Sequence, residues 1–341
     1  MRNTLHGLDR PHSRFYYLFY KAVFILVLIS AIGLLVYATS RLEYTWRWNR
    51  VPQYFWATGQ MEVRTDMAAT VASINTSDGQ IILQLESLDT PGQPEVIRLS
   101  SDAHVRVSEG EDLYQGDVLA DVPFSKPGIL LEGLWITVKV SAFAIVLGIG
   151  IGLMTGLFRL SANPALRWGA ITYIEIIRGS PLLVQIFLWY FVAGFVIDGL
   201  LQQVGMPPLP PLWYGVIALA IFTGAYVAEI VRAGIQSVSR GQMEAARSLG
   251  MTHGQAMRKV ILPQAFRRIM PPLAGQFISL IKDSSLLGVM AVRELTKATR
   301  EAVTSSLQSL ELWFTCALLY LVLTFTLSLF VQYLERRAVR R

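Results

Sequence analysis

The chain has 341 residues, of which 53% are hydrophobic and 16% charged, and its mean hydropathy is +0.44. This composition carries more apolar surface than one soluble core needs, so it excludes an ordinary soluble domain and predicts a membrane protein. The formal net charge of +6 does not by itself indicate a nucleic-acid partner, because the basic residues gather in blocks, as loops on one side of a bilayer require.

The first apolar run covers residues 22–38 and has nearly the length of a membrane span. A cleaved signal peptide is the alternative, because basic residues precede the run and Ala38-Thr39-Ser40 supplies small residues for cleavage. The run is long for a signal core, and Tyr37 and Arg41 stand where small residues would be wanted. We therefore expect residues 1–40 to form a cytoplasmic segment and a retained extra transmembrane helix.

Residues 41–127 have the pattern of a small β domain inserted after that helix. Two runs of alternating apolar residues flank Asp78-Gly79, which is a hairpin signal. Later residues, RVSEGEDLYQGDVLADV, resemble the hammerhead strands of biotinyl and lipoyl domains, but no lysine stands at the hairpin tip to carry a swinging cofactor. The single cysteine, Cys316, lies far away, so no disulfide is expected. We expect a β-barrel or sandwich with a structural or docking role.

Five further apolar runs approach the roughly 20 residues that a bilayer needs. Six spans in all place both termini on one side, and the basic blocks make that side cytoplasmic, including the tail 338–341. Residues 41–127 are then periplasmic, in agreement with the thirteen acidic and seven basic residues of the segment 41–128. The five runs are 136–158, 170–196, 212–230, 269–292 and 312–333.

Small residues recur at helical spacing in the second span. Gly148, Gly152 and Gly156 lie four residues apart and so share one helix face. Glycines at this spacing let helix backbones approach closely where lipid supplies no hydrophobic driving force. We interpret them as a helix-packing surface.

Four charged residues lie in or beside the apolar runs, where an unpaired charge is costly. Glu175 and Arg178 are one helical turn apart and can pair. Lys282 and Asp283 are sequence neighbours that point in different directions, so at least one needs a partner on another helix. Two interpretations stay open for all four: structural pairing, or contact with a translocation path. Glu229 and Arg232 have the spacing of an ordinary pair at a helix end.

Residues 239–263 combine two short helical patterns. Ser239 with Gln242 and Thr252 with Gln255 match capping boxes, and Gly250 suits the left-handed residue that ends the first helix. Pro263 is expected to end the second helix. A ten-residue helix rises only about 15 Å, so neither helix crosses a bilayer. A DNA-binding role is disfavoured because both ends are tied to apolar spans.

The same stretch resembles the EAA loop of ABC importer permeases, the membrane-spanning subunits of these importers. The matching positions agree in residue type and spacing, with valine in place of the usual isoleucine: Glu244, Ala245, Ala246, Gly250, Val260, Leu262 and Pro263. Three longer stretches are similar to the polar amino acid permeases of the histidine/glutamine type: EIIRGSPLLVQIFLWYF, AYVAEIVRAGIQSVSRGQMEAARSLG and PPLAGQFISLIKDSSLLGVMAVREL.

The resemblance covers residues 128–337 and implies the type I ABC importer transmembrane fold, an all-α polytopic core. It implies a bacterial inner-membrane permease that carries a polar amino acid and couples to a separate ATPase through Glu244, Ala245, Ala246, Gly250, Leu262 and Pro263. The implied partners are ATP-binding cassette subunits, a periplasmic amino-acid-binding protein and a second permease, identical or paralogous. No cofactor is expected on this chain, since ATP and magnesium belong to the ATPase. The family core has five spans, so the first span and the β domain are additions.

Rival functions are weaker on sequence. The chain lacks the G-x-x-x-x-G-K-[ST], H-E-x-x-H and G-x-S-x-G patterns, and His6, His12, His104 and His253 are scattered over both predicted sides. An intramembrane enzyme would need a nucleophile and a base on facing spans. A secondary transporter or channel for small polar solutes remains the alternative, although it would have no use for an EAA loop.

Overall fold

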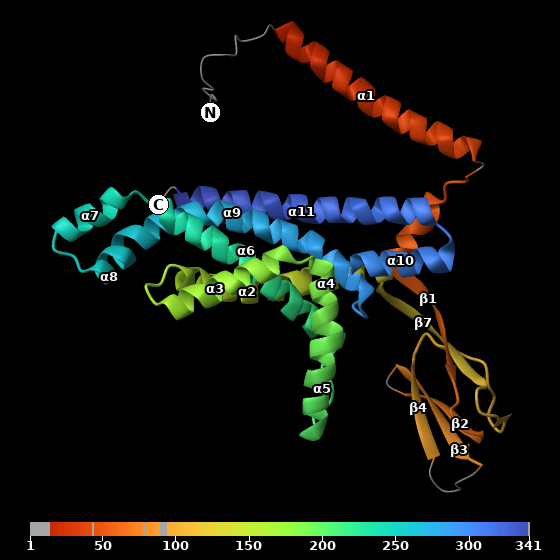
Figure 1. Cartoon of the computed structure of the whole chain (residues 1–341). Coiled ribbons are helices and arrows are strands. Elements are labelled where there is room, and N and C mark those ends of the chain that lie inside the picture. The colour runs from red at the N-terminus through yellow and green to blue at the C-terminus, as the bar shows by residue number, and fades with distance from the viewer. Residues whose placement is uncertain (1–13, 43, 78, 89–93, 340–341) are drawn as a thin grey trace. The chain divides into compact units, whose positions relative to one another are not determined.

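The computed structural model describes residues 14–42, 44–77, 79–88 and 94–339, and the chain divides into two compact units between Trp48 and Asn49. Figure 1 gives the order of the elements along the chain. Several predicted features lie outside the described residues: the basic residues before Arg14, the hairpin-tip Asp78, and the last two arginines. The side chains of residues 334–339 also lie outside them.

The first unit contains one long helix, α1 (Arg14–Arg41). Apolar side chains are exposed all around it, from Phe15 to Tyr37. A helix that is hydrophobic on every face belongs in lipid or against other apolar helices. Aromatic residues gather at its N-terminal end, as they do where spans meet a membrane interface.

The second unit begins within a 3₁₀ helix, η1 (Trp48–Tyr54), which is followed by an antiparallel β region. Its two sheets have the orders β1-β7-β5 and β4-β3-β2-β6. Leu83, Leu85 and Leu119 are fully buried at its centre, because apolar residues alternate along the strands. The predicted hairpin is confirmed, since Ser77 pairs with Gln80. The strands are β1 (Trp56–Arg64), β2 (Ala69–Ser77), β3 (Gln80–Ser87), β4 (Pro94–Ser100), β5 (His104–Val105), β6 (Asp112–Leu113) and β7 (Val118–Pro127).

The first and last strands form a ribbon that joins the β region to the helices. β1 pairs with β7 from Trp56 opposite Pro127 onward. The Gly128 amide then donates to the Phe55 carbonyl oxygen at 2.7 Å. A Cβ at Gly128 would collide with the Tyr54 carbonyl group, so the close approach of the two chain segments requires glycine. The ribbon therefore passes into the next helix without a slack linker.

The remaining chain is helical and surrounds an apolar core that includes Ile186, Leu219 and Leu280. The segments η2 and η3 are π-helical turns, and η4 is a 3₁₀ helix. In chain order, the helices are α2 (Ile129–Arg159), α3 (Pro164–Gly179), α4 (Leu182–Phe187), η2 (Leu188–Ala193), α5 (Gly194–Gln203), α6 (Pro211–Gln236), α7 (Arg240–Ser248), α8 (His253–Ala256), η3 (Met257–Ile261), α9 (Leu262–Asp283), η4 (Ser284–Val289), α10 (Leu295–Ser306) and α11 (Ser309–Val339).

Within the described ranges, five helical segments are long and apolar enough to cross a membrane: Phe15–Arg41, Ile129–Arg159, Leu182–Gln203, Pro211–Gln236 and Ser309–Tyr333. The predicted bounds 170–196 are wrong. The helix breaks at Ser180-Pro181, because Pro181 has no amide hydrogen and disfavours helical geometry at Ser180, and the apolar segment starts afresh at Leu182.

The predicted run 269–292 also differs from the structure. Its helix, α9, begins earlier, at Leu262, and ends at Asp283, after which η4 and an extended residue, Met290, follow. The charged residues of α9 keep it outside the set of strongly apolar helices. α9 packs against α6 and α11, beside which it lies in Figure 1.

The three spaced glycines of α2 lie against α6. A Cβ at Gly148 would lie 3.1 Å from the Thr223 side chain, and one at Gly156 would lie 3.0 Å from the Ala228 carbonyl oxygen. At Gly152 it would collide with Val227 and lie 2.8 Å from the Gly224 carbonyl oxygen. The two helix backbones therefore touch along this face, as small residues at helix interfaces permit.

The contact at Gly152 predicts a position-specific effect on stability. We expect Gly152→Ala to lower the free energy of unfolding by about 1–3 kcal/mol, because the added methyl group forces α2 and α6 apart. Thermal unfolding of the detergent-solubilised protein measures it. Gly150→Ala is the matched control, since a Cβ there meets open space and alanine favours the helix. Equal destabilisation by both variants would contradict the close-packing interpretation.

Candidate functional site

The exposed helix pair between α6 and α9 begins with α7, whose end is set by glycine. Gly250 has a φ of +81°, so the predicted left-handed residue is confirmed. The Gly250 amide donates to the Arg247 carbonyl oxygen at 3.0 Å, and the Met251 amide donates to that of Ala246 at 3.2 Å. These two bonds form a Schellman motif, which satisfies carbonyl groups that the end of the helix would leave free. The chain can therefore reverse sharply between α7 and α8.

One of the two predicted capping boxes forms. The Thr252 hydroxyl accepts from the Gln255 amide at 3.3 Å and the Gln255 side chain accepts from the Thr252 amide at 2.9 Å. The box at Ser239 was predicted wrongly, because the Ser239 side chain makes no cap bond. Its intended partner, Gln242, instead accepts from the Gln264 side-chain amide at 3.0 Å and so ties α7 to α9.

The second helix does not end at Pro263, which corrects the prediction. α8 passes through the π turn η3 into α9, with Pro263 in the first turn of α9. Proline lacks an amide hydrogen and clashes with the carbonyl group four residues before it. The π turn ends at Ile261, two residues before Pro263, and shifts the hydrogen-bond register just before the proline. The helix pair is thus continuous with α9.

The two faces of the helix pair differ in burial. Ala246 and Ala256 are buried, and Met243 and Met257 pack against an apolar cluster of α6 and α9. Glu244, Ala245 and Gly250 are exposed, as are Leu262 and Pro263 at the start of α9. Of the two alanines of the motif, one therefore faces the protein and the other faces outward.

Sequence reasoning missed Leu249 as a surface residue. Its side chain is 81% exposed, directly before Gly250, beside the outward face of α7. Its exposure leaves this apolar side chain accessible to a partner protein. The only signal in the sequence was the position of Leu249 directly before Gly250, where the helix ends and no following turn covers the side chain.

An ion cluster joins α2 to α6 near their ends. Glu229 pairs with Arg159 and with Arg232, accepting from the Arg232 Nη2 group at 2.8 Å. The predicted Glu229–Arg232 pair is confirmed, and Arg159, 70 positions away in sequence, is the partner that the sequence did not indicate.

The other charged residues of the spans are not paired as expected. Glu175 and Arg178 form no ion pair in the part of the chain that the structure describes; the Arg178 guanidinium instead lies over the Tyr226 ring, 5.2 Å from its centroid. Lys282 is exposed and Asp283 half-buried, and neither forms an ion pair with another described residue. A role in a translocation path stays a prediction for these four.

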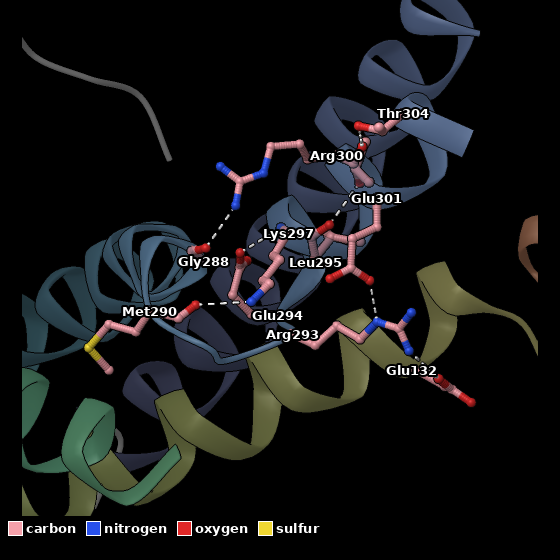
Figure 2. Close-up of polar contacts among 11 residues, drawn as sticks. Glu132, Gly288, Met290, Arg293, Glu294, Leu295, Lys297, Arg300, Glu301 and Thr304 are labelled. Atoms are coloured by element: carbon pink, nitrogen blue, oxygen red, sulfur yellow. Dashed lines mark hydrogen bonds and ion pairs between the residues drawn. The ribbon is translucent and has the colours of Figure 1, made fainter. Parts of the chain in front are cut away.

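At the far end of α9, cationic side chains from α10 hold the backbone of η4 (Figure 2). Lys297 donates to the Met290 carbonyl oxygen at 3.1 Å, and Arg300 to that of Gly288 at 3.0 Å. Arg293 pairs with Glu301 at 2.5 Å and lies 3.9 Å from Glu132 of α2. These side chains thus donate hydrogen bonds to backbone carbonyl groups that have no partner within a helix.

Glu294 fixes α10 itself. The carboxylate is fully buried and accepts from the Thr296 and Lys297 amides at 2.7 and 2.8 Å and from the Tyr320 hydroxyl at 3.0 Å. Burial raises the pKa of Glu294, and these donors act in the opposite direction by stabilising the ionised form. The Leu295 amide also donates to the Thr137 hydroxyl of α2 at 3.1 Å. α10 is therefore anchored to α2 and α11.

These features define a class of protein: a polytopic helical membrane protein with a short exposed helix pair rigidly joined to one of its long helices. Residues 148–340 match the model of the family described as "Binding-protein-dependent transport system inner membrane component". The chain belongs to this family of inner-membrane transport components.

Individual proteins that the chain resembles are also transport permeases or a transporter structure. The chain is 40% identical over 217 residues to the "Probable glutamine ABC transporter permease protein GlnM" of Bacillus subtilis, covering 63% of this chain and 95% of that one. It is 36% identical over 209 residues to the "Glutamine transport system permease protein GlnP" of Escherichia coli, covering 61% and 92%. A crystal structure of an amino acid ABC transporter with histidines matches at a TM-score of 0.55 and 42% identity, covering 61% of this chain and 94% of that one.

The unequal capping of the two short helices gives a testable difference. We expect Thr252→Ala to destabilise the start of α8 by about 1 kcal/mol, because it removes a formed side-chain cap. Amide hydrogen exchange of residues 253–257 measures this local opening. Ser239→Ala serves as the control, since the Ser239 side chain caps nothing. Comparable increases in exchange at the starts of α7 and α8 would contradict the assignment of caps.

Proposed function

We propose that this chain is the permease subunit of a binding-protein-dependent ABC importer for polar amino acids, and that it couples to a separate ATPase subunit through α7 and α8. The observation that carries the proposal is the exposed helix pair whose backbone continues unbroken into α9. A partner that moves this pair moves a long helix of the membrane core with it.

The outward residues suit a partner's cleft. Ala245 and Gly250 allow close approach of another backbone, Leu249 supplies an apolar contact, and Glu244 can accept from cationic donors. ATP and magnesium belong to the partner in this proposal, and the present chain binds neither. The contact transmits the conformational change that hydrolysis drives.

The proposed topology has six spans, with both termini cytoplasmic and residues 41–127 periplasmic. α9 is the fifth of these spans in chain order, although it is less apolar than the others. It packs against α6 and α11, and neighbouring helices allow a span to carry polar residues and prolines. If α9 did not cross the membrane, the basic C-terminal tail and the helix pair would lie on opposite sides.

The substrate class follows from the relatives. Two of them are named for glutamine and a matching structure is named for an amino acid transporter, which supports a polar amino acid as cargo. A periplasmic binding protein delivers it, and a second permease, identical or paralogous, completes the pathway. A secondary transporter or channel would need no exposed helix pair of this kind, so we favour the ATP-driven importer.

The coupling role predicts a specific loss of partner binding. We expect Glu244→Lys and Gly250→Asp to leave the protein inserted in the membrane but to abolish copurification of the ATPase subunit. The first reverses a charge on the contact face, and the second places a side chain at a φ of +81°. Copurification from membranes that contain the complete importer is the measurement.

Matched controls are available elsewhere in the chain. Glu95→Lys makes the same charge change on the exposed strand β4, and Gly254→Asp adds the same side chain where a Cβ meets open space and φ is not positive. Glu95→Lys should retain the ATPase fully, and Gly254→Asp should retain folding. Wild-type ATPase recovery and uptake in both Glu244→Lys and Gly250→Asp would refute the coupling role.

The proposed sidedness is tested by labelling. In a Cys316→Ala background, single cysteines at Ser77 and Ser239, both exposed, should react with an impermeant thiol reagent from opposite faces. Ser77→Cys should react in intact cells with permeabilised outer membranes, and Ser239→Cys only in inverted vesicles. Reaction of both from one face would rule out this topology.

A further inference from the structure

A cavity of 510 Å³ opens between α3, α6 and α9 near the start of the helix pair. Two arginines line it, Arg178 from α3 and Arg268 from α9, together with Glu229 of α6. Ile230 and Pro272 give it apolar walls. The glycine face between α2 and α6, the exposed face of α7 and the Glu294 anchor do not line this space.

The charges around the cavity are unbalanced. Its one acidic lining residue, Glu229, is already paired with Arg159 and Arg232. Arg178 lies over Tyr226, and Arg268 donates to the Ser237 carbonyl oxygen. No carboxylate among the described residues pairs with either of these two guanidinium groups, so an excess of positive charge faces the opening.

The arrangement selects a particular ligand chemistry. Stacking on Tyr226 holds one face of the Arg178 guanidinium and leaves its edge donors for a planar or tetrahedral oxyanion. Arginine binds phosphate and carboxylate oxygens through two parallel bonds. The apolar walls beside the two arginines suit a ligand that has hydrocarbon chains as well as an anionic group. Basic pockets between membrane helices on the cytoplasmic side are known to bind acidic lipid headgroups.

We propose that this cavity binds the headgroup phosphate of an acidic phospholipid from the cytoplasmic leaflet, with Arg178 and Arg268 as its ligands. The choice of leaflet rests on the orientation given under the proposed function. A bound phosphate bridges α3 and α9 beside Ser237, three residues before α7 begins at Arg240. It therefore stiffens the joint through which α6 passes into the coupling helix pair.

The test measures bound lipid directly. The complete importer is reconstituted in nanodiscs of phosphatidylcholine with or without phosphatidylglycerol, extracted in mild detergent, and examined by native mass spectrometry. We expect phosphatidylglycerol to remain bound, and at least tenfold weaker retention in Arg178→Gln/Arg268→Gln. Arg167→Gln is the matched control, since it removes an exposed arginine of the same helix that does not line the cavity.

Two further experiments distinguish lipid phosphate from other anions and distinguish a specific loss of binding from misfolding. Arg178→Lys/Arg268→Lys keeps both charges but loses the planar donors, and it should retain lipid at a level between wild type and the glutamine variant. Inorganic phosphate and free glutamine are each added as competitors, and neither should displace the lipid. Unchanged lipid retention in the glutamine variant, or arginine-dependent displacement by glutamine, overturns the proposal. Since no arm measures uptake, failure here is distinguishable from failure of the importer assignment.

Discussion

The structure depends on one backbone constraint, the continuity of α8, η3 and α9 through Pro263. A helix that stopped at this proline would leave the exposed pair on a flexible joint, and motion at Glu244 would be absorbed there. The π turn η3 prevents this, because it changes the hydrogen-bond register just before a residue that cannot donate. The same few residues thus place a contact surface outside the core and keep it mechanically joined to the core.

α9 is held differently at its two ends. Near Gln264 it is packed against the apolar cluster and bonded to Gln242 of α7. At η4 the chain is held both by Leu287, which is buried in the central apolar core, and by the long side chains of Lys297 and Arg300, which reach backbone carbonyl oxygens. α10 itself is locked to α2 and α11 through Glu294, Thr137 and Tyr320. The η4 end therefore combines apolar packing with charge-assisted hydrogen bonds to the backbone.

Local signals in the sequence were read correctly where the cause is local. The left-handed Gly250, the Thr252 cap and the Asp78-Gly79 hairpin each depend on residues within a few positions. The Glu229–Arg232 ion pair was predictable for the same reason, because its two residues are only three positions apart.

Features with distant or competing causes were not predictable in the same way. Arg159 reaches Glu229 only because the α2 glycines bring two helices together, and the Ser239 cap is lost because Gln242 bonds α9 instead. The apolar run that crosses Pro181 looked continuous because hydropathy does not register a missing amide hydrogen. The exposure of Leu249 likewise depends on how α7 is turned against α9, which periodicity over nine residues does not fix.

The β region packs against the same part of the helical core to which α10 is anchored. Tyr54 and Phe55, at the root of the ribbon, pack against the apolar cluster of Leu130, Leu295 and Leu312, and the Tyr54 hydroxyl donates to Gln308 at 3.4 Å. Gly128 leaves no slack between this root and α2. The root of the ribbon therefore packs beside α10, whose cationic side chains bond the backbone at η4, next to the end of α9. The β region is in this way connected to α9, the helix that continues from the exposed helix pair, although more than one hundred residues separate them in sequence.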